Sequence, residues 1–386
     1  MKRFILFTTL FLFTAGLYAG QPQRAAATPF GAEKPQFSVK NVPSDQQQVL
    51  AKSGAGDNQI ANIHEAADWL LTQQDPGGGF PWSVGDPNIY SNVQGPAGRG
   101  MLAGWNEARQ PVHMTSATAC GDYLVPTYPR TYTDGDPRFA THDPLFLEEL
   151  SLKKAVSTYS DFVQTYFWDK LTAGTYGETN DMDAFDFGQS VIDSRNAQGY
   201  ALGPWDISAI AVAAHVGGET AIANDIMAAI QNGVDSMQVG DTWDIIGLAG
   251  AIWASSVTGV DLDPTVGEWA SSSSTADLVT ELLNLQLADG SWTWSTAVDG
   301  TDITDHDTQT TAFAILALKA YDSSTYATEI SNAIAFIFSL QQPDGQILIY
   351  PGAPTTASGG VETHSEAMQA IGSNDDSLVP VELTSF

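Results

Sequence analysis

The stretch TADLVTELLNLQLADGSWTWSTAVDGTDITDHDTQTTAFAILAL, from Thr275 to Leu318, decides the fold of this 386-residue chain. Its first part, residues 276–287, is amphipathic, with apolar residues at helical spacing. A turn ending at Trp292 and an acidic loop follow, and residues 311–318 are then apolar on every side. A helix with one apolar stripe faces solvent, whereas a helix that is apolar all round must be surrounded by protein. The stretch therefore predicts an outer helix followed by a buried inner helix.

The same turn occurs at two other places. LQQPDG at residues 340–345 follows a second amphipathic segment, and WLLTQQDPGGGF at residues 69–80 follows another near the start of the chain. We align Gln73, Asp75 and Phe80 with the later copies, which requires an inserted glycine in the first copy. Repetition of one unusual turn indicates a protein built from helical repeats.

The rest of the chain alternates in the same way. Helices apolar all round are expected at residues 206–216 and 244–254, a mostly apolar helix at 308–320 and a last inner helix at 362–371. Amphipathic helices are expected at 219–237, 275–287 and 328–340. Before them we expect a helix at residues 93–107, a loop-rich insertion at 108–144 and one long helix at 145–171. This alternation predicts an all-α fold, an α/α toroid of five to six helix hairpins with an outer amphipathic ring and an inner buried ring.

The ends of the chain differ in composition from this domain. Lys2 and Arg3 precede an apolar run at residues 4–17, which predicts a signal peptide over residues 1–19. Residues 20–58 lack apolar periodicity and are expected to form a flexible leader. The toroid is expected over residues 59–372, followed by a linker at 373–386. No later apolar run approaches the roughly 20 residues of a membrane span, so we expect a secreted or cell-surface protein.

The charge of the chain restricts its partners. The formal net charge is −30, which argues against binding nucleic acid or anionic lipid. Beyond residue 196 the only Lys or Arg is Lys319. A site built from this half of the chain would therefore bind a neutral small molecule or glycan, or recruit a metal ion. Cys120 is the single cysteine, which excludes an intramolecular disulfide and a four-cysteine zinc site.

The turn with Gln286, Asp289, Gly290 and Trp292 resembles the QW repeat of the terpenoid cyclase and protein prenyltransferase superfamily. This resemblance implies an α/α toroid with a ligand cavity on its axis. It does not extend to the catalytic motifs, because Asp307 is the only acidic residue in the slots of the cyclase motif and Cys120 lies outside the region of the prenyltransferase zinc ligands. At the other end of the chain, residues 378–386 (LVPVELTSF) resemble the linker before type IX sorting domains of secreted bacterial proteins.

Inner helices of a toroid begin at one mouth of its axis, so residues near these starts are candidates for a ligand site. The alternative is a purely structural role, in which the aspartates are helix N-caps and the remaining residues support the fold. His364 and the nearby Glu366 are also candidates for acid–base work. The predicted cavity-mouth residues are Arg99, Trp205, Asp206, Trp243, Asp244, Asp307, Glu362 and His364.

The densest run of carboxylates lies in the acidic loop. Asp299, Asp302, Asp305 and Asp307 could together bind calcium, a hard cation that takes several oxygen ligands. The alternative is a solvated loop whose last aspartate caps the following helix.

Two functions remain open at this point. The sequence contains no Gly-x-Ser-x-Gly, phosphate-binding glycine loop or His-Glu-x-x-His motif. We therefore expect a ligand- or glycan-binding protein that uses the central cavity without cyclase or prenyltransferase activity. The alternative is a secreted polysaccharide-degrading enzyme, a lyase or glycoside hydrolase, of the α/α-toroid type.

Overall fold

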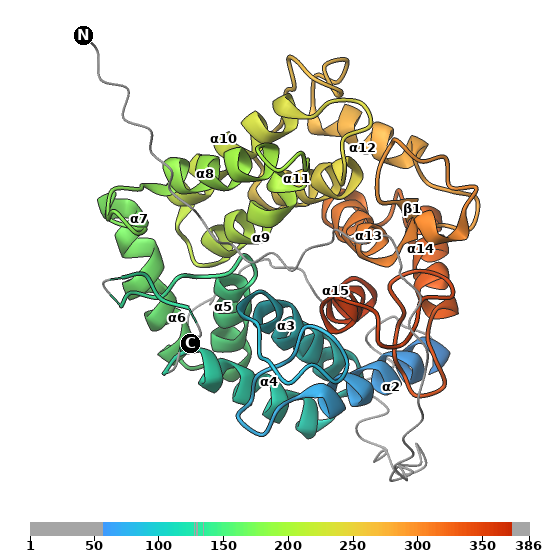
Figure 1. The fold of residues 1–386 in the computed structure, drawn as a ribbon, viewed down its shortest axis with the longest axis horizontal. Helices are drawn as coiled ribbons and strands as arrows, with labels where there is room; N and C mark the ends of the chain where they lie inside the picture. The colour runs from blue at the N-terminus through green and yellow to red at the C-terminus, as the bar shows by residue number, and fades with distance from the viewer. Residues whose placement is uncertain (1–56, 127, 129, 134, 373–386) are drawn as a thin grey trace, which may run out of the picture. The chain divides into compact units, whose positions relative to one another are not determined.

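The computed structural model describes residues 57–372, except residues 127, 129 and 134. Within this part of the chain, six helices form an inner ring in which each packs on the next and the last, α15, packs on the first, α3 (Figure 1). The predicted all-α toroid is confirmed. The predicted signal peptide and C-terminal linker lie outside the described residues, as does the predicted leader except for residues 57 and 58, which begin the first described helix. The inner helices are α3 (Ser91–Ala108), α5 (Asp143–Lys154), α9 (Gly203–Val216), α11 (Asp244–Thr258), α13 (Thr308–Asp322) and α15 (Gly360–Gly372).

An outer layer of helices surrounds this ring (Figure 1). None of the described helices is long and apolar enough to cross a membrane. Two short strands, β1 (Trp292–Thr293) and β2 (His306–Asp307), pair antiparallel between α12 and α13, and η3 (Ile303–Asp305) precedes β2. The outer helices are α2 (Asp57–Gln73), α4 (Pro111–Leu124), α6 (Thr158–Val163) with η2 (Gln164–Trp168) and α7 (Asp169–Ala173), α8 (Ala184–Asn196), α10 (Thr220–Ser236), α12 (Thr275–Asn284) and α14 (Ala327–Ser339).

Two predicted segments differ from the structure. The long helix expected at residues 145–171 is interrupted after α5, where Ala155 adopts a left-handed conformation with φ 54°. Its first half is the sixth inner helix, buried from Asp143 to Ser151, and its second half belongs to the outer layer. The loop-rich insertion expected at 108–144 contains α4, which begins at Pro111. This helix has only a weak apolar stripe, so periodicity did not reveal it.

Glycines allow the inner helices to approach each other closely. A Cβ atom on Gly250 of α11 would lie 2.5 Å from the Cα of Trp205 in α9. Similarly, a Cβ on Gly95 of α3 would lie 2.4 Å from the carbonyl carbon of His142, just before α5. Both distances are too short for any larger residue. The two glycines therefore set the backbone positions of Trp205 and His142, which lie at the axis.

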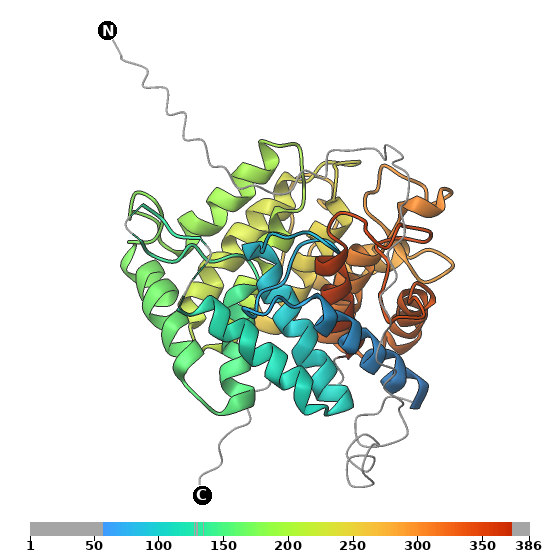
Figure 2. The ribbon, with the colours of Figure 1, turned by 60° about the horizontal axis from the view of Figure 1, so that its bottom comes forward.

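The repeated glutamine ties successive outer helices together. The side-chain amide of Gln286, after α12, donates to the carbonyl of Gly290 in its own turn and to that of Glu329 in α14, both at 3.0 Å. Gln341, after α14, donates in the same way to Asn62 of α2 at 2.7 Å. This second contact joins the last outer helix to the first described helix. The blue and red ends of this part of the chain accordingly lie side by side in Figures 1 and 2.

The first copy of the turn has the same length as the other two. Gln74, rather than Gln73, donates to the carbonyls of Gly78 and Ser116, the latter in α4. With Gln74 and Gly78 in register, Phe80 takes the place of Trp292 without an insertion. The alignment on Gln73 is therefore wrong by one residue, because two adjacent glutamines and three glycines left the register ambiguous.

The glycine of each turn lies against the backbone of the next outer helix. Gly78, Gly290 and Gly345 have φ of 98°, 92° and 96°, a conformation that favours glycine. A Cβ atom on Gly290 would lie 2.4 Å from the carbonyl oxygen of Asn332 in α14. The turn thus requires glycine for its conformation and for its contact.

Replacing Gly290 with alanine should destabilise the fold more than replacing Gly259. Both residues have positive φ, but a Cβ on Gly259 would meet no atom within 4 Å. We expect Gly259→Ala to lower the free energy of unfolding by about 1–2 kcal/mol through conformational strain alone. Gly290→Ala should lose at least about twice as much, because α14 must also move. Urea unfolding of both variants measures the difference, and equal losses would contradict the close contact.

Candidate functional site

Three buried or half-buried carboxyls meet at the N-terminal ends of the inner helices. We call Asp206 of α9 and Glu362 and Glu366 of α15 the axial acid cluster. Glu362 accepts hydrogen bonds from the Trp82 indole at 2.7 Å and from the Asn92 amide at 3.1 Å. Both donors are half-buried, so the cluster begins at the solvent-exposed rim of the ring.

Asp206 is held by a cation from the outer layer. The guanidinium of Arg195, near the end of α8, donates from Nε to one carboxylate oxygen at 2.5 Å and from Nη2 to the other at 3.2 Å. Such a two-point contact fixes both the position and the orientation of the carboxylate. Asp206 is therefore a buried, oriented carboxylate whose charge is balanced by a neighbour.

Glu366 lies one helical turn beyond Glu362 and is fully buried. Its Oε2 accepts a hydrogen bond from the Gln309 amide at 2.6 Å, while its Oε1 has no hydrogen-bond partner among the described residues. A buried polar atom without a partner costs free energy, so native proteins keep such atoms chiefly where function requires them.

Burial shifts the protonation of the cluster. It raises the pKa of Glu362 to about 7, an effect that the nearby Asp206 charge reinforces and the Trp82 hydrogen bond opposes. Burial and the Glu362 charge raise the pKa of Glu366 well above its ordinary value. Burial also raises the pKa of Asp206, but Arg195 opposes this rise. The cluster therefore combines Glu362, whose pKa lies near neutral pH, with Asp206, which is paired with an arginine, an arrangement suited to acid–base chemistry.

Aromatic rings lie at the axis beside the acids. Trp205 packs edge-on against Phe313 of α13 at 5.6 Å between ring centroids, and its ring lies 6.2 Å from that of His142. The Trp205 Nε1 and the His142 Nε2 are both buried without a hydrogen-bond partner in the described part of the chain. Buried polar atoms without a partner are rare in native proteins, and here two of them lie beside the axial acid cluster.

An ion pair links the inner helices near Glu366. Arg99 of α3 donates from Nε and Nη2 to the two oxygens of Glu149 in α5, at 2.9 and 3.0 Å. It also donates to Gln369 and lies over the ring of Trp253, 5.6 Å from its centroid. Arg99 thus links α3, α5, α11 and α15 across the ring, and its charge is neutralised within the protein.

The predicted mouth residues Trp243 and Asp244 lie in a second acid cluster. The Thr296 hydroxyl lies within hydrogen-bond distance of two carboxyls, 2.5 Å from Asp244 and 3.0 Å from Glu268. Burial and the Asp244 charge raise the pKa of Glu268 to about 7. Trp243 adopts a left-handed conformation with φ 67° and lies 5.6 Å from Trp294, ring to ring. These contacts involve none of the residues of the axial acid cluster.

His364 has a structural environment. Its Nδ1 accepts the backbone N–H of Ile347 at 2.9 Å, so its Nε2 donates to the carbonyl of Ala66 at 3.0 Å. Burial lowers its pKa to about 3, which keeps it neutral. In the other two turns the equivalent N–H groups, of Phe80 and Trp292, also donate to a side chain of the following inner helix. His364 is therefore placed to anchor the repeat.

The four aspartates of the acidic loop bind local groups. Asp299 and Asp302 are exposed, and each accepts two hydrogen bonds from the threonine two residues on. Asp305 accepts a bond from the Trp294 indole at 3.4 Å. Asp307 caps α13 through the backbone N–H of Thr310, and burial raises its pKa to about 6. These contacts do not test calcium binding, which stays a prediction.

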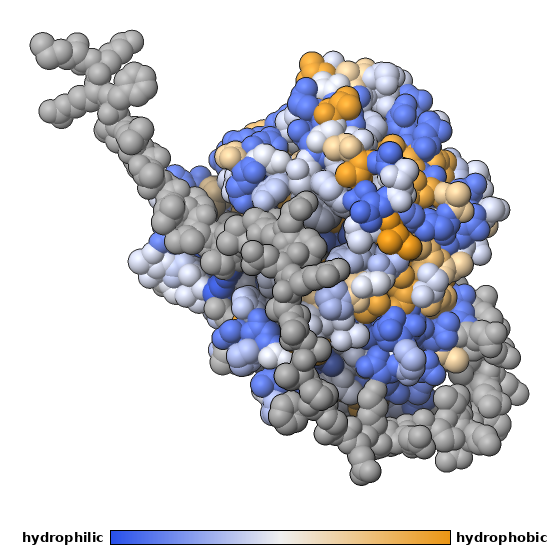
Figure 3. Space-filling view, turned by 45° about the vertical axis from the view of Figure 1, so that its right-hand side comes forward, coloured by the Kyte–Doolittle hydropathy of each residue, from blue (hydrophilic) through white to orange (hydrophobic). Residues whose placement is uncertain are grey.

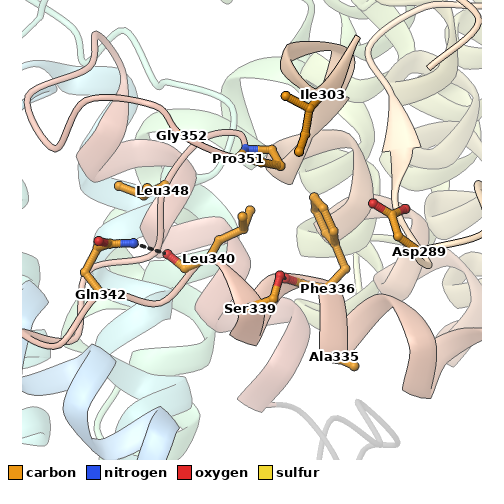
Figure 4. A pocket seen from close by; sticks show the side chains of 10 residues that line it. All are labelled: Asp289, Ile303, Ala335, Phe336, Ser339, Leu340, Gln342, Leu348, Pro351 and Gly352. Atoms are coloured by element: carbon orange, nitrogen blue, oxygen red, sulfur yellow. Dashed lines mark hydrogen bonds between the residues drawn. The ribbon is translucent and has the colours of Figure 1, made fainter. Parts of the chain in front are cut away.

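A separate pocket of about 480 Å³ lies in the outer layer, beside α14. Figure 4 shows Phe336 of α14 and Leu340, just after this helix, facing Ile303 of η3 and Pro351 of a neighbouring loop. The face that contains α14 has small hydrophobic patches among larger hydrophilic areas (Figure 3). Asp289 is the one acidic residue of the lining, and it already binds Ser291 and His306. The pocket therefore lacks the paired carboxyls of the axis.

Comparisons with known proteins agree with this architecture. No protein-family model matches the chain, and no curated protein matches it in sequence. Among solved structures it is similar to a polysaccharide lyase, with a TM-score of 0.53, 11% identity, and 85% of this chain and 97% of that chain covered. It is also similar, at a TM-score of 0.50 and 11% identity, to a glycosyl hydrolase of family 88 from Bacteroides vulgatus (82% and 98% covered) and to an unsaturated glucuronyl hydrolase specific for heparin (82% and 97% covered).

These similarities correct two expectations. They support a toroid fold but not membership of the terpenoid cyclase superfamily that the turn resembles. They also contradict the expectation of a binding protein without catalysis, because the similar structures are polysaccharide lyases and glycosyl hydrolases. At 11% identity they show a shared fold, and the activity itself is taken up below as a proposal.

Sequence reasoning missed several residues of the site. Arg195 is the last arginine of the chain, and no local pattern connects it with Asp206. Trp82, Asn92 and Gln309 carry no motif, and they reach the cluster only because the ring closes. Asp206 and Glu362 were found because they begin inner helices.

The raised pKa of Glu362 predicts a pH-dependent stability. Its carboxyl has a pKa near 4.3 in an unfolded chain and about 7 in the fold. The stabilisation that protonated Glu362 gives to the fold is thus fully present below about pH 4.5 and is lost as the pH rises through 7. We expect the free energy of unfolding of the wild type to fall between pH 5 and 8 by about 1–2 kcal/mol more than that of Glu362→Gln. Exposed Asp299→Asn should follow the wild type, and parallel curves for all three would refute the shift.

Proposed function

We propose that the protein is a glycoside hydrolase that cleaves a polysaccharide at the axial acid cluster. The observation that carries the proposal is the group of three hydrogen-bonded carboxyls at the starts of α9 and α15. Glycoside hydrolysis uses one carboxylic acid that donates a proton and one carboxylate that acts as nucleophile or base. The carbohydrate-active class of the similar toroids supports the same reaction.

The environments of the acids suggest their roles. Glu362, with a pKa of about 7, is the proposed general acid: it protonates the glycosidic oxygen, and the bond from this oxygen to the anomeric carbon then breaks. Asp206, oriented by Arg195, is the proposed carboxylate that stabilises the developing positive charge and takes the proton of the attacking water. Trp82 and Asn92 would orient the Glu362 carboxyl toward the substrate, while Gln309 holds the neighbouring Glu366.

The charges of the site favour a neutral glycan. Arg195 and Arg99 are the cations closest to the cluster, and each is already paired with a carboxylate. A substrate with a uronate group would bring its negative charge to an acidic site where both of these arginines are already paired. The half-buried rings of Trp82 and Trp205 instead offer apolar faces beside hydrogen-bonding groups, as sugar rings require.

We also propose that the protein is exported. The basic residues Lys2 and Arg3, the apolar run that follows them and the sorting-type linker at residues 378–386 support this location. Cleavage after Ala19 would leave Gly20 as the first residue. N-terminal sequencing of protein recovered from the culture medium checks this position, and a retained Met1 in exported protein would contradict it.

Activity is tested on a panel of neutral and uronate-containing polysaccharides, by release of new reducing ends. We expect cleavage of a neutral member, without the ultraviolet-absorbing unsaturated product that a lyase would form. Glu362→Gln and Asp206→Asn should each lower kcat/KM by about 10²–10⁴-fold, since each removes a proton-transfer or charge-stabilising group. The activity should decline above a pH near 7, as Glu362 loses its proton.

The control variant is Asp302→Asn, which changes an exposed carboxylate of the acidic loop. It should retain wild-type activity. Cleavage of only uronate-containing chains would refute the neutral-glycan proposal. Full activity in both Glu362→Gln and Asp206→Asn would refute the role of the axial acid cluster.

A further inference from the structure

Two outer helices bring three metal-ligating side chains together, away from the axis. His64 and Asp68 lie one turn apart on α2, and His113 lies in the first turn of α4. One ligand atom from each lies within 4.8 Å of the other two. Within residues 57–372, apart from the three that are not described, this is the one group of three His, Cys, Asp or Glu residues that meets this distance.

The ligand atoms lie close to the separations of a tetrahedral metal site. His113 Nε2 lies 3.0 Å from one oxygen of Asp68, and His64 Nε2 lies 3.6 Å from the other, while one atom from each of the three residues lies within 4.8 Å of the other two. A zinc ion with bonds of about 2.1 Å at tetrahedral angles separates its ligand atoms by roughly 3.4 Å. Small shifts of two half-exposed side chains would therefore complete the geometry.

The donor set and its burial select the type of ion. Two imidazoles and one carboxylate suit zinc and similar borderline cations, whereas calcium and magnesium prefer oxygen donors alone. His113 is fully buried, while Asp68 has 41% of its side chain exposed. The exposed side gives the ion a route to the site and leaves a fourth position for water.

We propose that His64, Asp68 and His113 form a zinc site that clamps α2 to α4. The site is independent of the proposed hydrolase activity, because it uses outer helices and none of the axial residues. Its position gives it a structural role: α2 is the helix that receives the glutamine contact from α14 and thereby closes the ring. A metal bridge from α2 to α4 would strengthen the attachment of this closing helix.

Zinc binding is measured by calorimetric titration of full-length protein purified without a polyhistidine tag. We expect one zinc ion per chain with a dissociation constant below about 1 µM, and a rise in melting temperature of roughly 3–6 °C at hundredfold excess over that constant. His64→Ala and Asp68→Asn should each weaken binding at least tenfold. Both residues are partly exposed, so the variants should fold, which circular dichroism verifies.

The matched control is His215→Ala, which removes a histidine of similar exposure from the end of α9. It should bind zinc like the wild type. If the three residues form only an ordinary hydrogen-bonded group, the wild type will show no zinc binding below about 100 µM. That result, or unchanged affinity in both His64→Ala and Asp68→Asn, would overturn the proposal.

Discussion

The contact on which the toroid depends is the double hydrogen bond of a glutamine amide at the end of an outer helix. One NH₂ group donates both to its own turn and to a carbonyl of the next outer helix, as Gln286 does with Gly290 and Glu329. The glycine of the turn lacks a Cβ and so rests directly on that next helix. Gln341 repeats the contact from α14 to α2 and closes the ring. Closure then places the starts of six inner helices around one axis, which is where the acids meet.

The axial acid cluster forms because the ring closes, but burying its carboxyls destabilises the fold. Burying Asp206, Glu362 and Glu366 together raises their pKa values, which destabilises the fold wherever the carboxyls must ionise. Arg195, Trp82 and Gln309 offset part of this cost through hydrogen bonds. A group of acids that stability alone would not favour is typical of functional sites. The glycines behind Trp205 and His142 keep the aromatic side of the site equally fixed.

Much of the architecture could be predicted from local patterns. Alternation of amphipathic and mostly apolar segments predicted the inner helices at residues 206–216, 244–254, 308–320 and 362–371, because burial on all sides favours apolar residues on every face. It failed at α5, where an inner helix runs into an outer segment with only Ala155 in a left-handed turn between them. It also failed at α4, because this helix has only a weak apolar stripe. The first copy of the turn was found, but its register was set by Gln74 and Ser116, which lie far apart in the sequence.

By itself the sequence determined the two-ring toroid, the repeated turn and the acidic residues at the starts of the inner helices. These features can be predicted from the sequence because helical periodicity, and the need for glycine in a turn with positive φ, depend only on a few neighbouring residues. Only the tertiary structure decided which acids converge: Asp206 and Glu362 meet across the ring, while Asp244 joins Glu268 and Thr296 instead. It also decided that Arg195 and Arg99 are neutralised within the protein. Charge pairing and burial depend on side chains from distant segments, and these come together only when the ring has closed.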